Sequence, residues 1–257
     1  MKALIINGKK VRLYESIDEM PIVNFQKYNK YLLIDAGIGS DDNDIDSHMV
    51  KIARYIKKDD KKSALQELQN LRQNLYMVNS ELSPKYLAFA ALVHSIDDTA
   101  TTDLSDEGLK EVLAKLKEAK HSAVVEFLIW LKKKVSAELD CYFPNTFTNA
   151  KEKEAYDRLK KRTLLVLDTI SNGSDNKDAI EEIDDFLLSM SKPHVFAGGD
   201  SAEVQYDKQF ENMCLLIAQK SSLDAKKMTV LQFYSAIETI RKQMEAESKA
   251  LNRGKRF

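Results

Sequence analysis

The residues ALQELQNLRQNLYMV (64–78) carry the pattern that decides the fold class. Their apolar positions recur every three or four residues, which is the spacing of one face of an α-helix. These positions are Ala64, Leu65, Leu68, Leu71, Leu75 and Val78. Similar patterns recur along most of the chain, whereas glycine (8) and proline (4) are scarce for 257 residues. Because few turn residues and 44% hydrophobic residues argue against disorder and against a β-sandwich, we expect a mainly α, multi-helix bundle.

The N-terminal residues predict a small β-hairpin followed by a helix. The β-prone runs 3–6 and 11–14 flank Asn7-Gly8, a dipeptide that suits a tight hairpin turn. A helix is expected to begin near Pro21, because a missing N–H costs nothing in the first helical turn. It should end within 36–40, where glycine readily supplies the left-handed conformation of a helix C-terminus.

The remaining helices are predicted from the same spacing, with polar stretches between them. The expected helical ranges are 49–56, 64–78, 86–96, 109–116, 121–141, 151–170, 180–187, 203–221 and 229–250. The residues TLLVLDTI (163–170) suggest that their helix passes from an exposed to a buried end. Residues 97–108 are interpreted as a polar loop, and 192–201, which contains Gly198-Gly199, as the most linker-like stretch.

The chain is expected to divide near Pro144, whose Asn/Thr-rich surroundings stop a helix. The predicted regions are 1–145, a hairpin plus helical bundle, and 146–257, a helical region with a basic tail. At 257 residues the chain exceeds the usual size of one domain, so two small domains or one elongated domain would fit.

The charge balance and the short apolar runs limit the kinds of molecule that this chain is expected to bind. Lys plus Arg (39) nearly balance Asp plus Glu (40), so no overall field would attract nucleic acid or a membrane. The longest apolar runs, 88–93 and 164–167, are far shorter than the roughly 20 residues that span a bilayer. Residues 1–16 lack the apolar core of an export signal, and Cys141 and Cys214 form no CxxC pair. We therefore expect no membrane association, and synthesis in a reducing cytoplasm.

The acidic run DDNDID (41–46) is the best metal candidate, since hard cations prefer clustered carboxylates. An EF-hand needs glycine at the sixth loop position and glutamate at the twelfth, but these places hold Asp46 and Ile52. The run is therefore interpreted as a solvated loop whose acids also favour the start of the next helix. A metal-dependent enzyme with a site built from Asp41, Asp44 and Asp46 is kept as an alternative.

The other motifs in the sequence do not indicate a catalytic site. Gly37 and Gly39 lack the third glycine and the lysine of a phosphate loop, and are interpreted as a helix end. The histidines have no paired zinc-ligand spacing, and His94, beside an apolar run, is expected to be partly buried. They are His48, His94, His121 and His194. Cys141 has no local activating partner, so we expect no enzymatic activity, no metal and no cofactor.

Two features suit binding to other proteins. Aromatic residues at helical spacing are first of all core residues, but their abundance also suits helix-in-groove contacts. Examples are Tyr28, Tyr31, Phe233 and Tyr234. The segment KALNRGKRF (249–257) has four basic residues and no acid, and is interpreted as a solvated tail or as an arm for acidic protein surfaces or phosphates. The arm would bind partners, or nucleic acid, through Lys249, Arg253, Lys255, Arg256 and Phe257.

Three segments resemble helical proteins of bacteriophages. They are VRLYESIDEMPIVNFQKYNKYLLIDAGIGSDDNDID (11–46), LVHSID (92–97) and MTVLQFYSAIETIRKQ (228–243). These phrases are similar to those in structural or tail-assembly proteins of phages that infect Bacteroides and related hosts, including crAss-like phages. None of the three is a catalytic or ligand motif.

The resemblance implies a non-enzymatic virion structural protein in the neck, connector or tail. Such a protein would form a homo-oligomeric ring with other phage structural proteins as neighbours. It would be made in the host cytoplasm and then enter the virion. Cyclic assembly uses two different patches on each subunit, which helical faces of mixed charge can supply. The alternative is a tail-assembly chaperone that binds a long helical partner and is absent from the mature particle.

Overall fold

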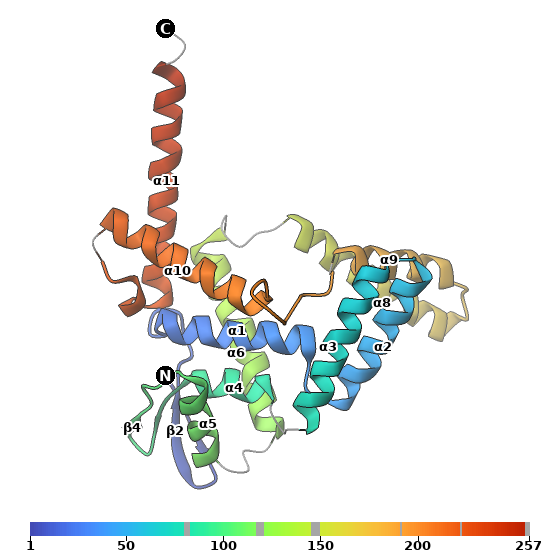
Figure 1. Ribbon diagram of the computed structural model, residues 1–257, viewed down its shortest axis with the longest axis horizontal. Coiled ribbons are helices and arrows are strands. Elements are labelled where there is room, and N and C mark those ends of the chain that lie inside the picture. The colour runs from blue at the N-terminus through green and yellow to red at the C-terminus, as the bar shows by residue number, and fades with distance from the viewer. Residues whose placement is uncertain (80–82, 117–120, 145–149, 191, 222, 255–257) are drawn as a thin grey trace.

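The computed structural model describes residues 1–79, 83–116, 121–144, 150–190, 192–221 and 223–254 (Figure 1). It is 73% helical and begins with an antiparallel hairpin, so the predicted mainly α fold with an N-terminal β-hairpin is confirmed. The helices are α1 (Ile22–Ile38), α2 (Asp42–Lys57), α3 (Lys61–Asn79), α4 (Pro84–Ala91), α5 (Asp106–Lys115), α6 (His121–Tyr142), α8 (Ala150–Asn172), α9 (Lys177–Met190), α10 (Ala202–Ser221), the 3-10 turn η1 (Ala225–Lys227) and α11 (Val230–Gly254). The strands are β1 (Lys2–Ile6), β2 (Lys9–Leu13), β3 (Val93–Ile96) and β4 (Thr99–Ala100).

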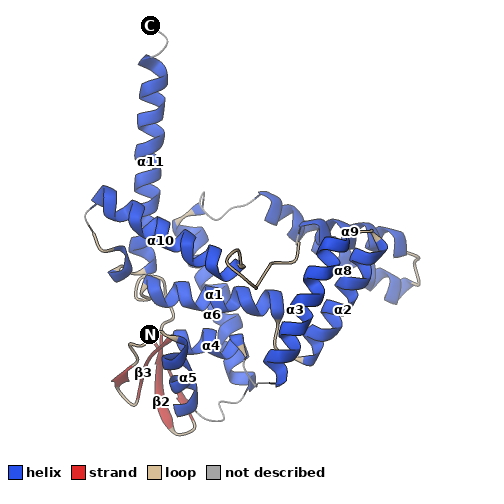
Figure 2. Ribbon diagram, in the orientation of Figure 1, coloured by secondary structure: helices blue, strands red, loops and turns tan. Residues whose placement is uncertain are grey.

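These elements form two lobes that meet at the C-terminal end of α1 (Figure 1). We call the sheet with α1, α4, α5, α6, α10 and α11 the main lobe, and α2, α3, α8 and α9 the outer lobe. Figure 2 shows the strands in the main lobe, away from the outer lobe. Consecutive helices α2 and α3 pack against each other as a hairpin, and so do α8 and α9. The outer lobe is therefore built from two helical hairpins.

The sheet is larger than the predicted hairpin. Strand β3 adds to the open side of β2, with Val11 opposite Ile96, and β4 adds to β3. The helix predicted over 86–96 is thus wrong at its end, because α4 stops at Ala91. Val93 and Ile96 are β-branched and buried, so they suit a strand that pairs with β2.

The predicted polar loop over 97–108 is also partly wrong. Asp97 and Asp98 adopt positive φ angles of 47° and 64°, which allow the tight turn between β3 and β4. The helix α5 then begins at Asp106, capped by the Ser105 side chain, which accepts a hydrogen bond from the Gly108 N–H at 3.1 Å. Short polar side chains in this stretch therefore build a turn and a helix start.

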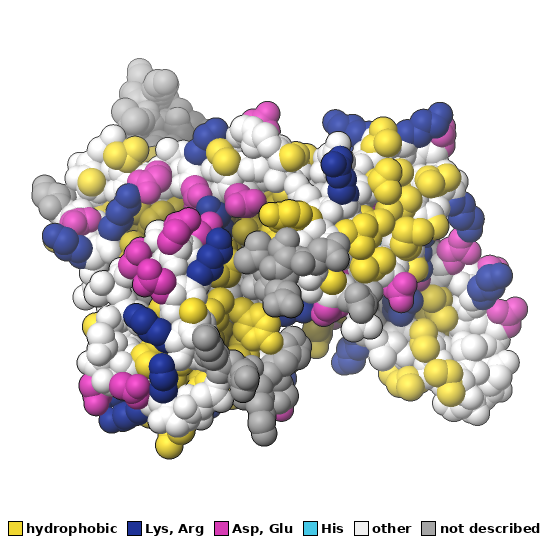
Figure 3. Space-filling model, turned by 60° about the horizontal axis from the view of Figure 1, so that its bottom comes forward, with side chains coloured by type: hydrophobic (Ala, Val, Ile, Leu, Met, Phe, Trp, Pro, Cys, Tyr) yellow, Lys and Arg dark blue, Asp and Glu magenta, His cyan; other side chains and the backbone are white. Residues whose placement is uncertain are grey.

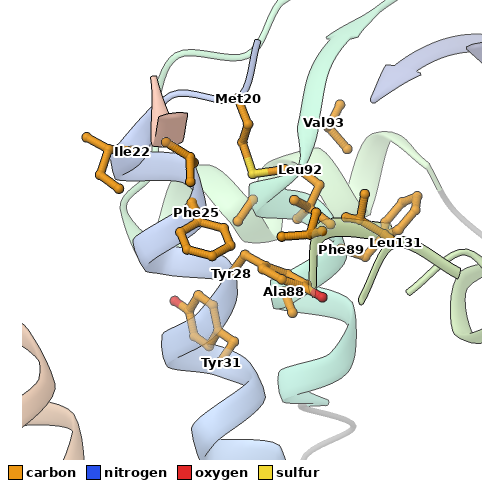
Figure 4. Packing of buried hydrophobic residues seen from close by; sticks show 14 of the residues in the cluster. Met20, Ile22, Phe25, Tyr28, Tyr31, Ala88, Phe89, Leu92, Val93 and Leu131 are labelled. Atoms are coloured by element: carbon orange, nitrogen blue, oxygen red, sulfur yellow. The ribbon is translucent and has the colours of Figure 1, made fainter. Parts of the chain in front are cut away.

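A hydrophobic core fills the main lobe (Figure 4). Phe25 and Tyr28 from α1 pack with Phe89 from α4 in this core, as Figure 4 shows. Phe233 from α11 is fully buried in the same core and stacks on Phe210 from α10, with ring centroids 5.8 Å apart. Burying each such side chain contributes about 1.5–3 kcal/mol. The core draws on both predicted regions, 1–145 and 146–257, whose boundary stays a prediction.

Two glycines at the end of α1 have different roles. Gly39 follows the last residue of α1 with a φ of 70°, as expected for a helix end. The sequence predicts that Gly37 also belongs to the helix end, but this residue lies inside α1. A β-carbon at Gly37 would lie 2.3 Å from the ring of Phe196, which is buried. The missing side chain thus lets the linker-like residues 192–201 pack against α1.

Two further expectations about the second half need correction. The helix over 151–170 is confirmed as α8, but its second half is not buried: Leu164, Leu167 and Ile170 are all more than half exposed. The reason is that α8 packs against α9 along one side and faces solvent with the other. The helix expected over 229–250 is confirmed as α11, but it continues to Gly254 and projects from the main lobe (Figure 1).

Candidate interaction surface

Helix α3 buries several polar residues and leaves several large apolar residues exposed, although Ala64 and Leu71 are buried as well. Its most buried side chains include Glu67, Asn70 and Asn74, which are 2%, 1% and 0% exposed. Leu68 and Tyr76, by contrast, are 51% and 65% exposed. A helix on the surface of a monomer normally shows the opposite arrangement. The outward residues of α3 therefore need a different explanation from core packing.

Helix α2 extends the same apolar surface. Its exposed apolar residues follow the helical spacing on the side away from buried His48. Because α2 and α3 lie side by side, we treat the exposed apolar residues of both helices as one surface. We call this surface the outer face, and define it by Met49, Val50, Ile56, Leu65, Leu68 and Tyr76.

A second apolar surface follows α8. Four residues lie on its solvent side at intervals of three to eight positions, and each is 48% to 76% exposed. We call them the α8 stripe: Tyr156, Leu159, Leu167 and Ile170. The space-filling view in Figure 3 shows hydrophobic side chains gathered at the end of the molecule that the outer lobe forms. Large apolar areas of this kind mark binding surfaces on soluble proteins more often than they mark chance exposure.

The inner side of the outer lobe is organised around Glu67. His48 Nδ1 lies 2.9 Å from Glu67 Oε1, and its Nε2 lies 2.8 Å from the Ile38 carbonyl oxygen at the end of α1. Lys51 Nζ lies 3.4 Å from the same Glu67 oxygen. Burial by itself would lower the pKa of His48, but the hydrogen bonds to Glu67 and to the Ile38 carbonyl outweigh it and raise the pKa. The polar interior therefore ties α2 and α3 to α1.

Ion pairs join the two hairpins of the outer lobe. Arg54 Nη2 donates to Asp184 Oδ2 at 2.7 Å, and Lys58 Nζ lies 2.8 Å from Asp185 Oδ1. Lys57 also pairs with Glu181, and Arg162 of α8 with Asp184. We call these four pairs the ion-pair row; three of them join α2 to α9, and the Arg162 pair lies within the α8–α9 hairpin. Burial would raise the pKa of Asp184, but Arg162 and Arg54 lower it, so this carboxylate is ionised at neutral pH.

The buried apolar contact between the same hairpins is small. Among the described residues, the buried cluster of the outer lobe consists of Tyr55, Ala64 and Leu188. The main-lobe core draws on α1, α4, α5, α6, α10 and α11. The position of α9 on α2 thus depends strongly on charge.

A pocket lies where the outer lobe meets α1. Its volume is about 500 Å³, within the range of small-molecule sites. We call it the interlobe pocket; it is lined by Leu33, Ala36, Gly37, Lys51, Arg54, Glu67, Asn70, Asp184, Leu187, Leu188, Met190, Lys192, Pro193 and His194. One wall is held by Asn70, whose Nδ2 donates to the His194 carbonyl oxygen at 3.1 Å. The pocket therefore combines charged and apolar walls.

The acidic run 41–46 is not a loop, because α2 begins at Asp42. Asp41 caps this helix by accepting a hydrogen bond from the Asp44 N–H at 3.1 Å, and Asp44 accepts in return from the Asp41 N–H at 3.0 Å. This is a capping box, so both carboxylates already serve the helix start. Asp46 is exposed one turn further on. Within the part of the chain that the structure describes, no group of three or more His, Cys, Asp or Glu side chains could hold a metal ion.

A partly buried carboxyl group lies beside that helix start. Asp35, near the end of α1, has its Oδ1 3.9 Å from Lys85 Nζ, and Lys85 also reaches Asp41 Oδ2 at 3.1 Å. Burial raises the pKa of the Asp35 carboxyl group to about 6, although the nearby positive charge of Lys85 acts to lower it. Oδ1 of Asp35 is buried and finds no hydrogen-bond partner among the described residues. The junction between the lobes thus contains a carboxyl group that is costly to ionise.

The predicted basic arm is only partly described. Lys249 is exposed on α11, and the backbone of Arg253 belongs to the same helix. Lys255, Arg256 and Phe257 lie outside the described residues. The structure brings none of the described arm near the outer face or the interlobe pocket (Figure 1).

The other candidates occupy separate places. His94 is half-buried against Tyr14, with ring centroids 5.4 Å apart, as expected for a core residue. Cys141 is exposed on α6, whereas Cys214 is buried in the main-lobe core. Tyr28, Tyr31 and Phe233 are buried, which confirms their assignment to the core. No described helix is both long and apolar enough to cross a membrane.

A polar stripe in the sequence of α3 could have indicated that apolar residues of this helix face outward. The polar residues Ser63, Glu67, Asn70 and Asn74 follow one another at helical intervals and are all buried. This polar stripe competes with the apolar stripe for the inward side of α3. Comparison with known proteins adds no further constraint: no protein-family model, curated protein or solved structure matches this chain.

Proposed function

We propose that this chain is a non-enzymatic assembly protein that packs against copies of itself through the outer lobe. In the setting that the resemblance implies, it is a bacteriophage virion protein of the neck, connector or tail ring. It would be made in the host cytoplasm and incorporated into the particle beside other phage structural proteins. The observation that supports this proposal is α3, which keeps Glu67 inside and presents Leu68 to solvent.

A second copy is the partner that the surfaces favour. The outer lobe carries two different apolar surfaces, the outer face and the α8 stripe. A head-to-tail contact, in which one surface of a subunit binds the other surface of its neighbour, needs two such patches and generates rings when the rotation closes. A single helix that carries apolar residues can pack along the seam between two helices. The α8 stripe of one copy would therefore bind between α2 and α3 of the next.

The proposal is tested by the mass of the protein in solution. Size-exclusion chromatography with light scattering should give an oligomer for the unchanged chain. The double variant Leu65→Glu, Leu68→Glu should be monomeric, because charged side chains resist burial in an apolar interface. Leu223→Glu, at an equally exposed leucine outside the outer lobe, is the matched control and should stay oligomeric. A monomeric unchanged chain at every concentration would contradict the proposal.

Mixing two variants tests the head-to-tail geometry. Leu159→Glu, Leu167→Glu damages the α8 stripe and leaves the outer face intact, whereas the first double variant does the reverse. Each variant alone should be monomeric, but an equal mixture should form dimers, since one good surface of each kind remains. A symmetric contact of the outer face with itself would instead make the Leu159→Glu, Leu167→Glu variant dimeric on its own. Detection in infected cells but not in purified particles would favour the tail-assembly chaperone over the virion component.

A further inference from the structure

The cations of the interlobe pocket have more hydrogen-bond donors than they have partners among the described residues. Arg54 donates one N–H to Asp184, and Lys51 directs its ammonium group at Glu67. A guanidinium group has five N–H donors and an ammonium group three. Both side chains are about two-fifths exposed, at 37% and 40%, so their remaining donors are accessible. Lys192, at the edge of the same pocket, is exposed as well.

Three of the four carboxylate oxygens that line the pocket already have partners. Glu67 Oε1 is shared by His48 and Lys51. Both carboxylate oxygens of Asp184 accept hydrogen bonds from arginines, Oδ2 from Arg54 and Oδ1 from Arg162. The charges of the lining side chains are three cations, Lys51, Arg54 and Lys192, against two anions. A ligand that supplies acceptors and negative charge therefore fits better than a cation.

The opposite walls are apolar. Leu33 and Ala36 come from α1, and Leu187, Leu188 and Met190 come from α9 and its C-terminal end. An apolar group that covers these side chains would gain about 25 cal/mol of binding free energy for each Å² of apolar surface removed from water. Gly37 adds a stretch of α1 backbone without a side chain to the same wall. The pocket can thus take a ligand with an anionic head and an apolar body.

We infer that the interlobe pocket binds an amphipathic organic anion, with its carboxylate or phosphate head at Lys51, Arg54 and Lys192 and its apolar body against α1 and α9. Such a ligand contacts α1, α2, α9 and residues 192–194 at once, so it would tie the two lobes together. The inference is independent of the proposed self-assembly, because the pocket lies on the inner side of the outer lobe and not on its outer face.

Calorimetric titration of the full chain with small probes tests the inference. Octyl phosphate and octanoate, both below their micelle concentrations, represent the two head groups, and at least one should bind. Inorganic phosphate should bind at least about tenfold more weakly, because it lacks the apolar body. Octyltrimethylammonium has the same chain with the opposite charge, and equally tight binding of this cation would overturn the assignment of an anion site.

Two pairs of variants locate the binding. Lys192→Ala should weaken binding about tenfold by removing one charge-assisted contact, whereas Lys62→Ala, on the exposed side of α3, should not change it. Ala36→Phe fills the pocket from an exposed position and should abolish binding, whereas Ala53→Phe, exposed on α2, is the matched control. Circular dichroism checks that all four variants fold. Binding that survives Ala36→Phe, or that Ala53→Phe reduces equally, would overturn the inference.

Discussion

In the main lobe, α1 turns Phe25 and Tyr28 towards a core that draws on several helices. In the outer lobe, α3 turns Glu67 and Asn74 inward and leaves Leu68 exposed. Both helices are amphipathic, but their apolar sides meet opposite surroundings. The main lobe is therefore stabilised chiefly by apolar burial, and the outer lobe by hydrogen bonds and ion pairs, which contribute less per residue and depend more on conditions. A protein that keeps an apolar surface outside its own core has it available for a neighbour.

The largest effect is expected for Phe233→Ala in the main lobe. The side chain is fully buried between Phe210 and the rest of the core, so its loss leaves a cavity. The free energy of unfolding should fall by about 3–5 kcal/mol. Urea unfolding followed by circular dichroism measures this change. A loss of less than about 1 kcal/mol would mean that the core does not have the packing described.

A slightly smaller effect is expected for His48→Ala in the outer lobe. Glu67 would stay buried and lose its 2.9 Å partner, while Lys51 would remain 3.4 Å away. Breaking such a pair should lower the free energy of unfolding by about 3 kcal/mol. Replacing both members, as in His48→Leu with Glu67→Leu, should recover much of the loss, since no charge is then left unpaired. An equal loss in the double variant would show that the pair matters through its shape alone.

The third prediction concerns pH at the junction of the lobes. Because the pKa of Asp35 is raised to about 6 in the folded chain, the folded state holds this proton more tightly than the unfolded state does. Its ionisation therefore destabilises the fold as pH rises from about 4 to about 6. Asp35→Asn removes that cost, and should stabilise by about 2 kcal/mol at pH 7 relative to its effect at pH 4. Unfolding curves at both pH values provide the test, and an effect that is independent of pH would contradict it.

The ion-pair row should respond to salt more than the core does. Asp184→Asn leaves Arg54 and Arg162 without their shared carboxylate and should cost about 1 kcal/mol at low ionic strength. Hydrogen exchange should become faster in α9 and stay unchanged in α1. The difference from the unchanged chain should shrink in about 1 M salt, where charges are screened beyond about 3 Å. Exchange that rises equally in both helices would mean that the two lobes unfold as one unit.

The smallest effect on stability is expected on the outer face. Leu68→Asn should change the free energy of unfolding by less than about 0.5 kcal/mol, because the leucine is half exposed. The same substitution should weaken self-association, which light scattering measures. A large loss of stability in the monomer would show that Leu68 belongs to the core and would remove the basis of the proposed interface.

Local patterns predicted much of the fold. Asn7-Gly8, Pro21 and Gly39 each carry a local signal, so the hairpin and both ends of α1 followed from the sequence. The strand over 93–96 did not, because its apolar residues suit a helix equally and only pairing with β2 decides.

The candidate site was harder to predict for a related reason. Residues 64–78 contain an apolar stripe and a polar stripe, and their spacing shows a helix without showing which stripe faces inward. The choice depends on contacts distant in sequence, such as His48 with the Ile38 carbonyl and Asn70 with the His194 carbonyl. The interlobe pocket likewise depends on residues more than a hundred positions apart, which no local motif records.

The projecting end of α11 has a mechanical consequence. Ile240 is the last buried residue of this helix up to Lys249, where the described burial ends, and from Ile240 to Gly254 the chain rises about 20 Å at 1.5 Å per residue. Ion pairs between successive turns, such as Arg241 with Glu245, stiffen it. A flexible segment of the same length would sample a broad range of distances. A rigid helix would instead hold a partner bound near Lys249 at a fixed distance and angle from the main lobe.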